Sequence, residues 1–138
     1  MEYVEGRPTR SDPSGERNLR VLLAEDDAAL RDLLSSTLRD EGYEVLEAAS
    51  VAQALQLVER GPVDLVLTDL GMPNERGDDL VERLLRAAHP PLVVMMTAFP
   101  DEATRRRARD LGGTLLEKPF SLEQVRRTVR DATSLGPR

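Results

Sequence analysis

Short apolar runs and longer amphipathic segments alternate along the chain from residue 19 onward. Successive runs, such as Val21-Leu22-Leu23-Ala24, lie about 22 to 24 residues apart, which is typical of a repeated βα unit. The predicted strands are residues 19–25, 43–48, 63–68, 92–97 and 114–117, and the predicted helices are residues 28–41, 51–60, 77–88, 101–111 and 121–134. Ten elements therefore alternate without a break.

Residues with special backbone or capping properties stand at the ends of several predicted helices. Glycine adopts the left-handed conformation that often ends a helix, and serine or proline suits a helix start. The glycines at predicted helix ends are Gly42, Gly61 and Gly112, and the residues at predicted starts are Ser50, Pro100 and Ser121.

The second to fourth predicted strands are rich in Val, Leu and Met and do not alternate strictly with polar residues. Such strands fit a parallel sheet whose two faces are both covered by crossover helices. Right-handed crossovers then favour an α/β fold with a doubly wound open sheet, whose ligand site lies beyond the carboxyl ends of its strands.

The composition narrows the class of protein further. A chain of 138 residues fits one domain, predicted at residues 19–134, between a flexible N-terminal tail at residues 1–18 and a C-terminal tail or linker at residues 135–138. The chain has no cysteine, no signal-peptide pattern and no apolar stretch near 18 residues, which predicts a cytoplasmic protein without membrane association. A net charge of -6 argues against direct nucleic-acid binding.

Reactive side chains follow the apolar runs at four places. Asp69 closes one run, Glu25-Asp26 follows another, Thr97 ends a third, and Lys118 follows the last. Parallel strands would bring these groups to one edge of the sheet. Each pair of carboxylates about 4 Å apart would cost on the order of 4 kcal/mol at an effective dielectric constant near 20. Lys118 and a hard divalent cation such as Mg²⁺ would offset this repulsion, and the set would suit a carboxylate that accepts a phosphoryl group.

Four motifs in order resemble the response-regulator receiver domain of bacterial two-component signalling across nearly all of residues 19–134. They are Val21-Leu22-Leu23-Ala24-Glu25-Asp26-Asp27, Leu67-Thr68-Asp69-Leu70-Gly71-Met72-Pro73, Val94-Met95-Met96-Thr97-Ala98 and Lys118-Pro119-Phe120. The resemblance implies a five-stranded flavodoxin-like sheet of order 2-1-3-4-5 with helices on both faces. It also implies a cis peptide bond between Lys118 and Pro119.

The resemblance assigns a role to each strand-end residue. It implies phosphorylation by a sensor histidine kinase or a histidine phosphotransfer protein, followed by output to a partner or effector domain through residues 101–134. The domain itself would catalyse only phosphoryl acceptance and slow autodephosphorylation, so it is not expected to be an enzyme. The implied roles are phosphoacceptor for Asp69, phosphoryl binding for Thr97 and Lys118, and Mg²⁺ binding for Asp26, Asp69, the Gly71 carbonyl and, mostly through water, Glu25.

Three positions depart from the family pattern or leave alternatives open. The acidic pair is Glu25-Asp26 or, in a shifted register, Asp26-Asp27; we prefer the first, because Asp27 suits a helix N-cap. Leu115 stands where the family commonly has an aromatic residue that moves together with the threonine. Phe99 is either a packing residue of its loop or a shield over the phosphoryl group.

Other functions fit the residues less well. A phosphatase with an aspartyl-phosphate intermediate would need a second aspartate at position 71, which is glycine, and a flavin site would be disfavoured by the acids after the first strand. A degenerate receiver that binds partners without phosphorylation remains the alternative function.

Overall fold

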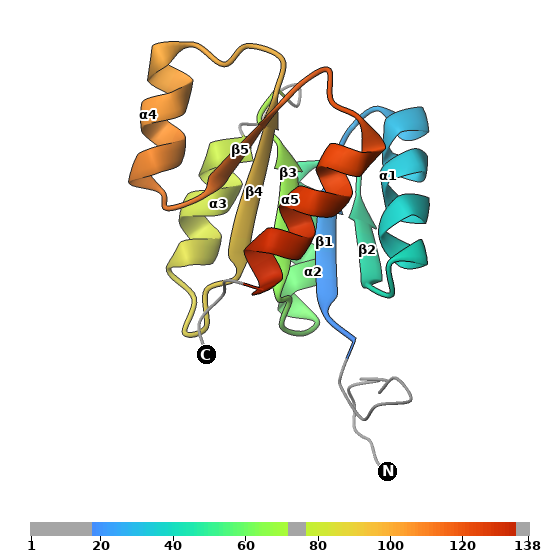
Figure 1. The fold of residues 1–138 in the computed structure, drawn as a ribbon. Coiled ribbons are helices and arrows are strands. Elements are labelled where there is room, and N and C mark those ends of the chain that lie inside the picture. Colours follow the sequence, from blue (N-terminus) through green and yellow to red (C-terminus); the bar gives the residue numbers. More distant parts are fainter. Residues whose placement is uncertain (1–17, 72–76, 135–138) are drawn as a thin grey trace.

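Five strands and five helices alternate along the chain in the computed structural model, which describes residues 18–71 and 77–134 (Figure 1). The strands are β1 (Arg20–Ala24), β2 (Glu44–Ala48), β3 (Leu65–Asp69), β4 (Leu92–Thr97) and β5 (Thr114–Glu117). The helices are α1 (Ala28–Asp40), α2 (Val51–Glu59), α3 (Gly77–Leu85), α4 (Glu102–Asp110) and α5 (Leu122–Ser134). The predicted α/β class and all ten elements are confirmed, whereas both predicted tails lie almost wholly outside the described residues.

The strands form one parallel sheet of order β2-β1-β3-β4-β5, as predicted. Its register aligns Ala24 with Thr68, Asp69 with Met96, and Thr97 with Glu117. The carboxyl ends of β1, β3, β4 and β5 therefore meet at one edge. That edge is where an open doubly wound sheet places its ligands.

Two apolar layers hold the helices against the sheet. Val21 and Leu23 of β1 face α1 and α5, while Leu22 and Ala24 face the side covered by α2 and α3. A smaller cluster fixes α4 and α3 against β4 on that second side. Because successive side chains of a strand point to opposite faces, a strand buried on both sides has to be apolar throughout.

Several predicted boundaries shift by one to three residues. Asp69 is the last residue of β3 rather than the residue after it. The helix predicted to end at residue 88 ends at Leu85, since Arg86 and Ala87 donate to carbonyls three residues back, at Arg83 and Leu84. These short hydrogen bonds mark a tightened last turn rather than further α-helix.

The predicted cap residues have mixed outcomes. Ser50 caps α2 through the Gln53 N–H, and Asp27 caps α1 through the Leu30 N–H. The prediction for Pro100 is wrong, because the adjacent Asp101 accepts from the Thr104 N–H and caps α4.

The glycines also differ from one another. Gly42 and Gly112 have positive φ angles of 98° and 73°, as expected at helix ends. Gly61 follows the end of α2, as predicted, but it does not take the left-handed conformation expected there. A Cβ atom at Gly61 would lie 3.0 Å from Nη1 of Arg20, so a larger residue there would require the guanidinium to shift slightly.

Candidate functional site

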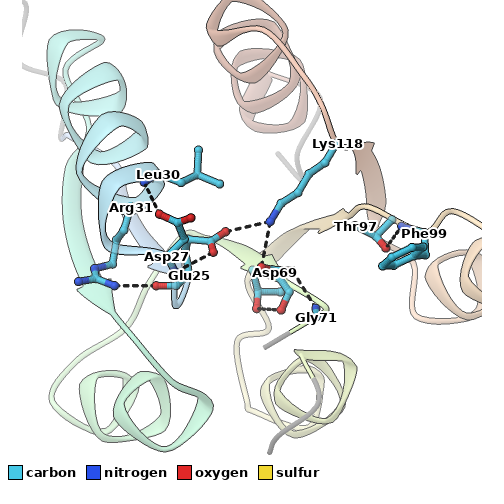
Figure 2. A network of polar contacts seen from close by, with 10 residues as sticks. Glu25, Asp27, Leu30, Arg31, Asp69, Gly71, Thr97, Phe99 and Lys118 are labelled. Atoms are coloured by element: carbon cyan, nitrogen blue, oxygen red, sulfur yellow. Dashed lines mark hydrogen bonds and ion pairs between the residues drawn. The ribbon is translucent and has the colours of Figure 1, made fainter. Parts of the chain in front are cut away.

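Asp69, Glu25 and Lys118 come together at the carboxyl edge of the sheet (Figure 2). β3 ends at Asp69, β1 runs directly into Glu25, and Lys118 follows β5. The Lys118 N–H donates to the Thr97 carbonyl at 2.7 Å, which extends the pairing of β5 with β4 to the lysine. The sheet register, rather than a flexible loop, thus places the lysine opposite the two acids.

Asp69 is held by a different donor at each carboxylate oxygen. Its Oδ1 accepts from the Gly71 N–H at 2.8 Å, and its Oδ2 lies 3.0 Å from the Lys118 ammonium. The side chain is almost buried, so both charge-assisted hydrogen bonds fix its direction more firmly than they would in water.

Glu25 is even less accessible, with 1% of its surface exposed. Its Oε2 accepts from the Asp27 N–H at 3.0 Å, and its Oε1 lies 3.3 Å from the Lys118 ammonium. Burial raises the pKa of Glu25 to about 7; the negative charge of Asp69 also raises it, while Asp27 and Lys118 act in the opposite direction. Glu25 therefore titrates near neutral pH.

For Lys118, the neighbouring charges outweigh the effect of burial on the pKa. Burial favours its neutral form, but the hydrogen bonds and negative charges of Asp69 and Glu25 outweigh burial and raise the pKa of the lysine. The lysine thus remains a fixed positive charge at neutral pH.

Asp26 completes a group of three acids. Carboxylate oxygens of Glu25, Asp26 and Asp69 all lie within 4.8 Å of one another, and Asp26 is exposed while the other two are buried. Opposite ligands of an octahedral Mg²⁺ ion lie about 4 Å apart, so small side-chain movements suffice to fit the ion. When all three acids are ionised, they and Lys118 together carry two net negative charges, and an all-oxygen donor set of this charge fits a hard divalent cation.

Asp27 is directed away from this group. Its Oδ1 accepts from the Leu30 N–H at 3.0 Å, the contact of a helix N-cap. The geometry therefore favours Glu25-Asp26 over Asp26-Asp27 as the acidic pair.

Thr97 lies at the same edge of the sheet, but its hydroxyl contacts its own loop. The Oγ1 atom accepts from the Phe99 N–H at 3.0 Å (Figure 2). Phe99 is 80% exposed. Its side chain therefore does not pack within its loop, which was one of the two interpretations of this residue. The Lys118–Pro119 peptide bond is cis, as the resemblance implied.

The structure describes the turn after Asp69 as far as Gly71 and places Leu115 beside β4. Met72 and Pro73, the last two residues of the motif that contains Asp69, lie outside the described residues. Leu115 is half-buried and packs on the cluster that contains Val93 and Met95. It fills apolar space beside β4 at the position where the family commonly has an aromatic residue.

Arg31 is a part of the site that no sequence motif pointed to. Its Nη1 donates to the main-chain carbonyl of Glu25 at 2.8 Å (Figure 2). A backbone acceptor leaves no signature in the side-chain pattern. The only available signal was the position of Arg31 on the first turn of the helix that follows the acids.

Comparison with known proteins identifies the family. Residues 21–130 match the family described as response regulator receiver domain. The chain is 39% identical over 117 residues to the transcriptional regulatory protein PdtaR of Mycobacterium tuberculosis, a match that covers 83% of this chain and 57% of PdtaR. It is 31% identical over 114 residues to sporulation initiation phosphotransferase F of Bacillus subtilis, covering 82% of this chain and 92% of that protein.

Solved structures show the same fold. The non-phosphorylated HemR receiver domain of Leptospira biflexa superposes with a TM-score of 0.82 at 30% identity, covering 88% of this chain and 98% of that one. The chemotaxis protein CheY4 of Vibrio cholerae gives a TM-score of 0.78 at 27% identity, covering 83% and 98%.

Proposed function

Because the chain belongs to the response regulator receiver domain family, we propose that it is a phosphorylation-activated switch in which Asp69 accepts the phosphoryl group. The observation that carries this proposal is the contact of Asp69 with Lys118 at 3.0 Å, beside two further acids at the carboxyl edge of the sheet. Receiver domains of two-component systems are signalling modules rather than enzymes, and they partner with histidine kinases or phosphotransferases. The donor proposed here is accordingly a phosphohistidine.

In the proposed transfer a carboxylate oxygen of Asp69 attacks phosphorus while the bond from phosphorus to the imidazole nitrogen breaks. The leaving imidazole keeps the bonding electron pair, and the product is an aspartyl phosphate. Lys118 neutralises charge on the arriving phosphoryl oxygens, and the Gly71 N–H keeps the carboxylate in place. Thr97 would donate its hydroxyl hydrogen to a phosphoryl oxygen.

A bound Mg²⁺ ion would supply further neutralisation of the phosphoryl oxygens. The residues proposed to hold it are Asp26, Asp69 and the Gly71 carbonyl directly, and Glu25 mostly through water. The proximity of the three carboxylates supports this set. A phosphotransferase among the relatives supports phosphoryl transfer as the chemistry of the site.

Output is proposed to run through residues 101–134, which contain α4, β5 and α5. Leu115 lacks the ring that would rotate in the usual coupling, so we expect the loop after Thr97 and α4 to transmit the change instead. The chain spans little more than half of PdtaR, and its partner or effector domain is therefore proposed only as a class.

Intact mass spectrometry after incubation with acetyl phosphate tests the phosphoacceptor. We expect the wild type to gain one phosphoryl mass when Mg²⁺ is present, and Asp69→Asn to gain none, because the amide cannot serve as the nucleophile. Asp64→Asn is the matched control, since Asp64 lies before β3 and binds the Arg20 N–H away from the site; it should still be labelled.

Two results would contradict this assignment. Labelling of Asp69→Asn to the wild-type level would place the phosphoryl group on another residue. No labelling of the wild type, together with no response to beryllofluoride, would favour a degenerate receiver that binds its partner without phosphorylation.

A further inference from the structure

This inference rests on the proposed function: we infer that Arg31 is a positioning residue that orients the Glu25-Asp26 pair toward the proposed Mg²⁺ site. Among the described residues, the polar partners of Arg31 are the Glu25 main-chain carbonyl and the Glu47 carboxylate, not a proposed metal ligand oxygen or the Asp69 carboxylate. Its Nη1 donates to the Glu25 carbonyl oxygen at 2.8 Å (Figure 2). That carbonyl belongs to the peptide unit joining Glu25 to Asp26, so this hydrogen bond fixes the plane from which Asp26 extends.

Asp26 needs such an external support more than its neighbours do. Glu25 is buried and held by Lys118 and the Asp27 N–H, and Asp27 is held as the N-cap of α1. Asp26, between them, is exposed. Its direction therefore depends chiefly on the two peptide units beside it.

Arg31 is itself held by a second acid outside the cluster. Its Nε lies 3.7 Å from Glu47 Oε1, and Glu47 Oε2 accepts from the buried Ser35 hydroxyl at 2.9 Å and lies 3.2 Å from Arg39 Nη2. Glu47 is on β2, where it is aligned with Leu23 of β1. The chain of contacts thus runs from β2 through Arg31 to the turn after β1.

The hydrogen bond from Arg31 to the Glu25 carbonyl resembles the contacts that hold metal ligands in place in other proteins. Groups that hydrogen-bond to the ligands or their backbone fix the geometry of the site, and removing them typically lowers metal affinity by about 10 to 100-fold. Glu47 balances the positive charge of Arg31. The guanidinium can therefore orient the acids without offsetting the negative charge that attracts Mg²⁺.

The test is the dissociation constant of Mg²⁺, measured by calorimetry and by amide chemical shifts of Asp26 and Asp69. We expect Arg31→Ala to weaken Mg²⁺ binding by about 10-fold, at the lower end of that range because its acceptor is a backbone atom. Arg31→Lys should recover part of the affinity, since an ammonium can still reach the carbonyl but cannot also engage Glu47 in the same way.

Arg39→Ala is the matched control. Arg39 lies on the same helix and contacts the same Glu47, but its other contact in the described part of the chain is the Val45 carbonyl, not the acidic turn. Its Mg²⁺ affinity should stay within about twofold of wild type. Two measurements without metal separate a positioning effect from a loss of stability: urea unfolding, and hydrogen exchange of the Asp27 amide. Arg31→Ala should speed the exchange of the Asp27 amide, and Arg39→Ala should not.

Equal Mg²⁺ affinity in Arg31→Ala and wild type would overturn the role of Arg31 while leaving the phosphoacceptor role of Asp69 intact. Equal weakening in Arg31→Ala and Arg39→Ala would also overturn it, because the effect would then come from α1 as a whole. If the wild type binds no Mg²⁺ yet is labelled on Asp69, this inference and the proposed Mg²⁺ site both fail, while the phosphoacceptor role of Asp69 stands. If Asp69 is not labelled although Mg²⁺ binds and Arg31→Ala weakens that binding, the phosphoacceptor role fails and this inference stands.

Discussion

At the scale of single residues, the neighbouring acids Glu25 and Asp26 differ in their exposure to solvent. Glu25 is buried and its pKa is raised to about 7, mainly by burial, while Asp26 beside it in sequence is exposed. Protonation of Glu25 removes one negative charge from the cluster, and a bound Mg²⁺ ion would offset two. Protons and Mg²⁺ should therefore compete for this site near neutral pH.

The first prediction concerns the stability of the metal-free protein. The folded-state pKa of Glu25 lies above its ordinary value of 4.5, so the folded state binds the proton more tightly than the unfolded state. The stability that this proton contributes is present below about pH 4.5 and is lost as the pH rises to about 7. Urea unfolding between pH 5 and 8 should show this loss.

Glu25→Gln should flatten that pH dependence, because the amide does not titrate. Glu59→Gln, at an exposed acid at the end of α2, is the control and should keep the wild-type slope. Identical slopes in Glu25→Gln and wild type would show that Glu25 does not control the pH dependence.

At the scale of elements, the start of α5 is fixed by a reciprocal pair of hydrogen bonds. The Ser121 Oγ accepts from the Gln124 N–H at 3.0 Å, and the Gln124 Oε1 accepts from the Ser121 N–H at 2.8 Å. This is a capping box, in which two backbone donors at a helix end are satisfied together. It follows the Lys118–Pro119 segment closely and so fixes where α5 leaves the site.

Ser121→Ala should lower the free energy of unfolding by about 1 kcal/mol, the usual cost of losing a serine N-cap. Ser36→Ala is the control, since Ser36 is exposed within α1 and alanine is a better helix former. Urea unfolding would measure both. A loss in Ser121→Ala no larger than in Ser36→Ala would mean that the cap adds little to the folded state.

The sequence predicted the ends of the strands, but it did not predict contacts with main-chain atoms. Apolar runs followed closely by Glu25, Asp69, Thr97 and Lys118 located the strand ends, because strands buried on both faces are mainly apolar and polar residues gather where they leave the core. The link from Arg31 to the Glu25 carbonyl was not predictable, since its acceptor is a main-chain atom and its second partner lies on another strand.

At the scale of the whole molecule, one sheet separates two cores that share its strands. Leu38 of α1 belongs to the core on the α1 and α5 side, and Leu80 of α3 belongs to the core on the α2 side; both are fully buried. Each core rests on alternate residues of the same strands, so neither can come apart without exposing the other. The site spans the ends of these strands and should be lost in the same transition.

The last prediction tests this coupling. Leu38→Ala and Leu80→Ala should each lower the free energy of unfolding by about 2 to 5 kcal/mol, because each leaves a cavity in a packed layer. Circular dichroism and tyrosine fluorescence should report coincident urea transitions for both variants, as expected of two-state unfolding. Leu33→Ala is the control on α1, since Leu33 is 49% exposed and its loss should cost much less. Separate transitions for the two probes in either variant would show that the faces of the sheet unfold independently, and the strand ends that form the site would then not be held by the fold as a whole.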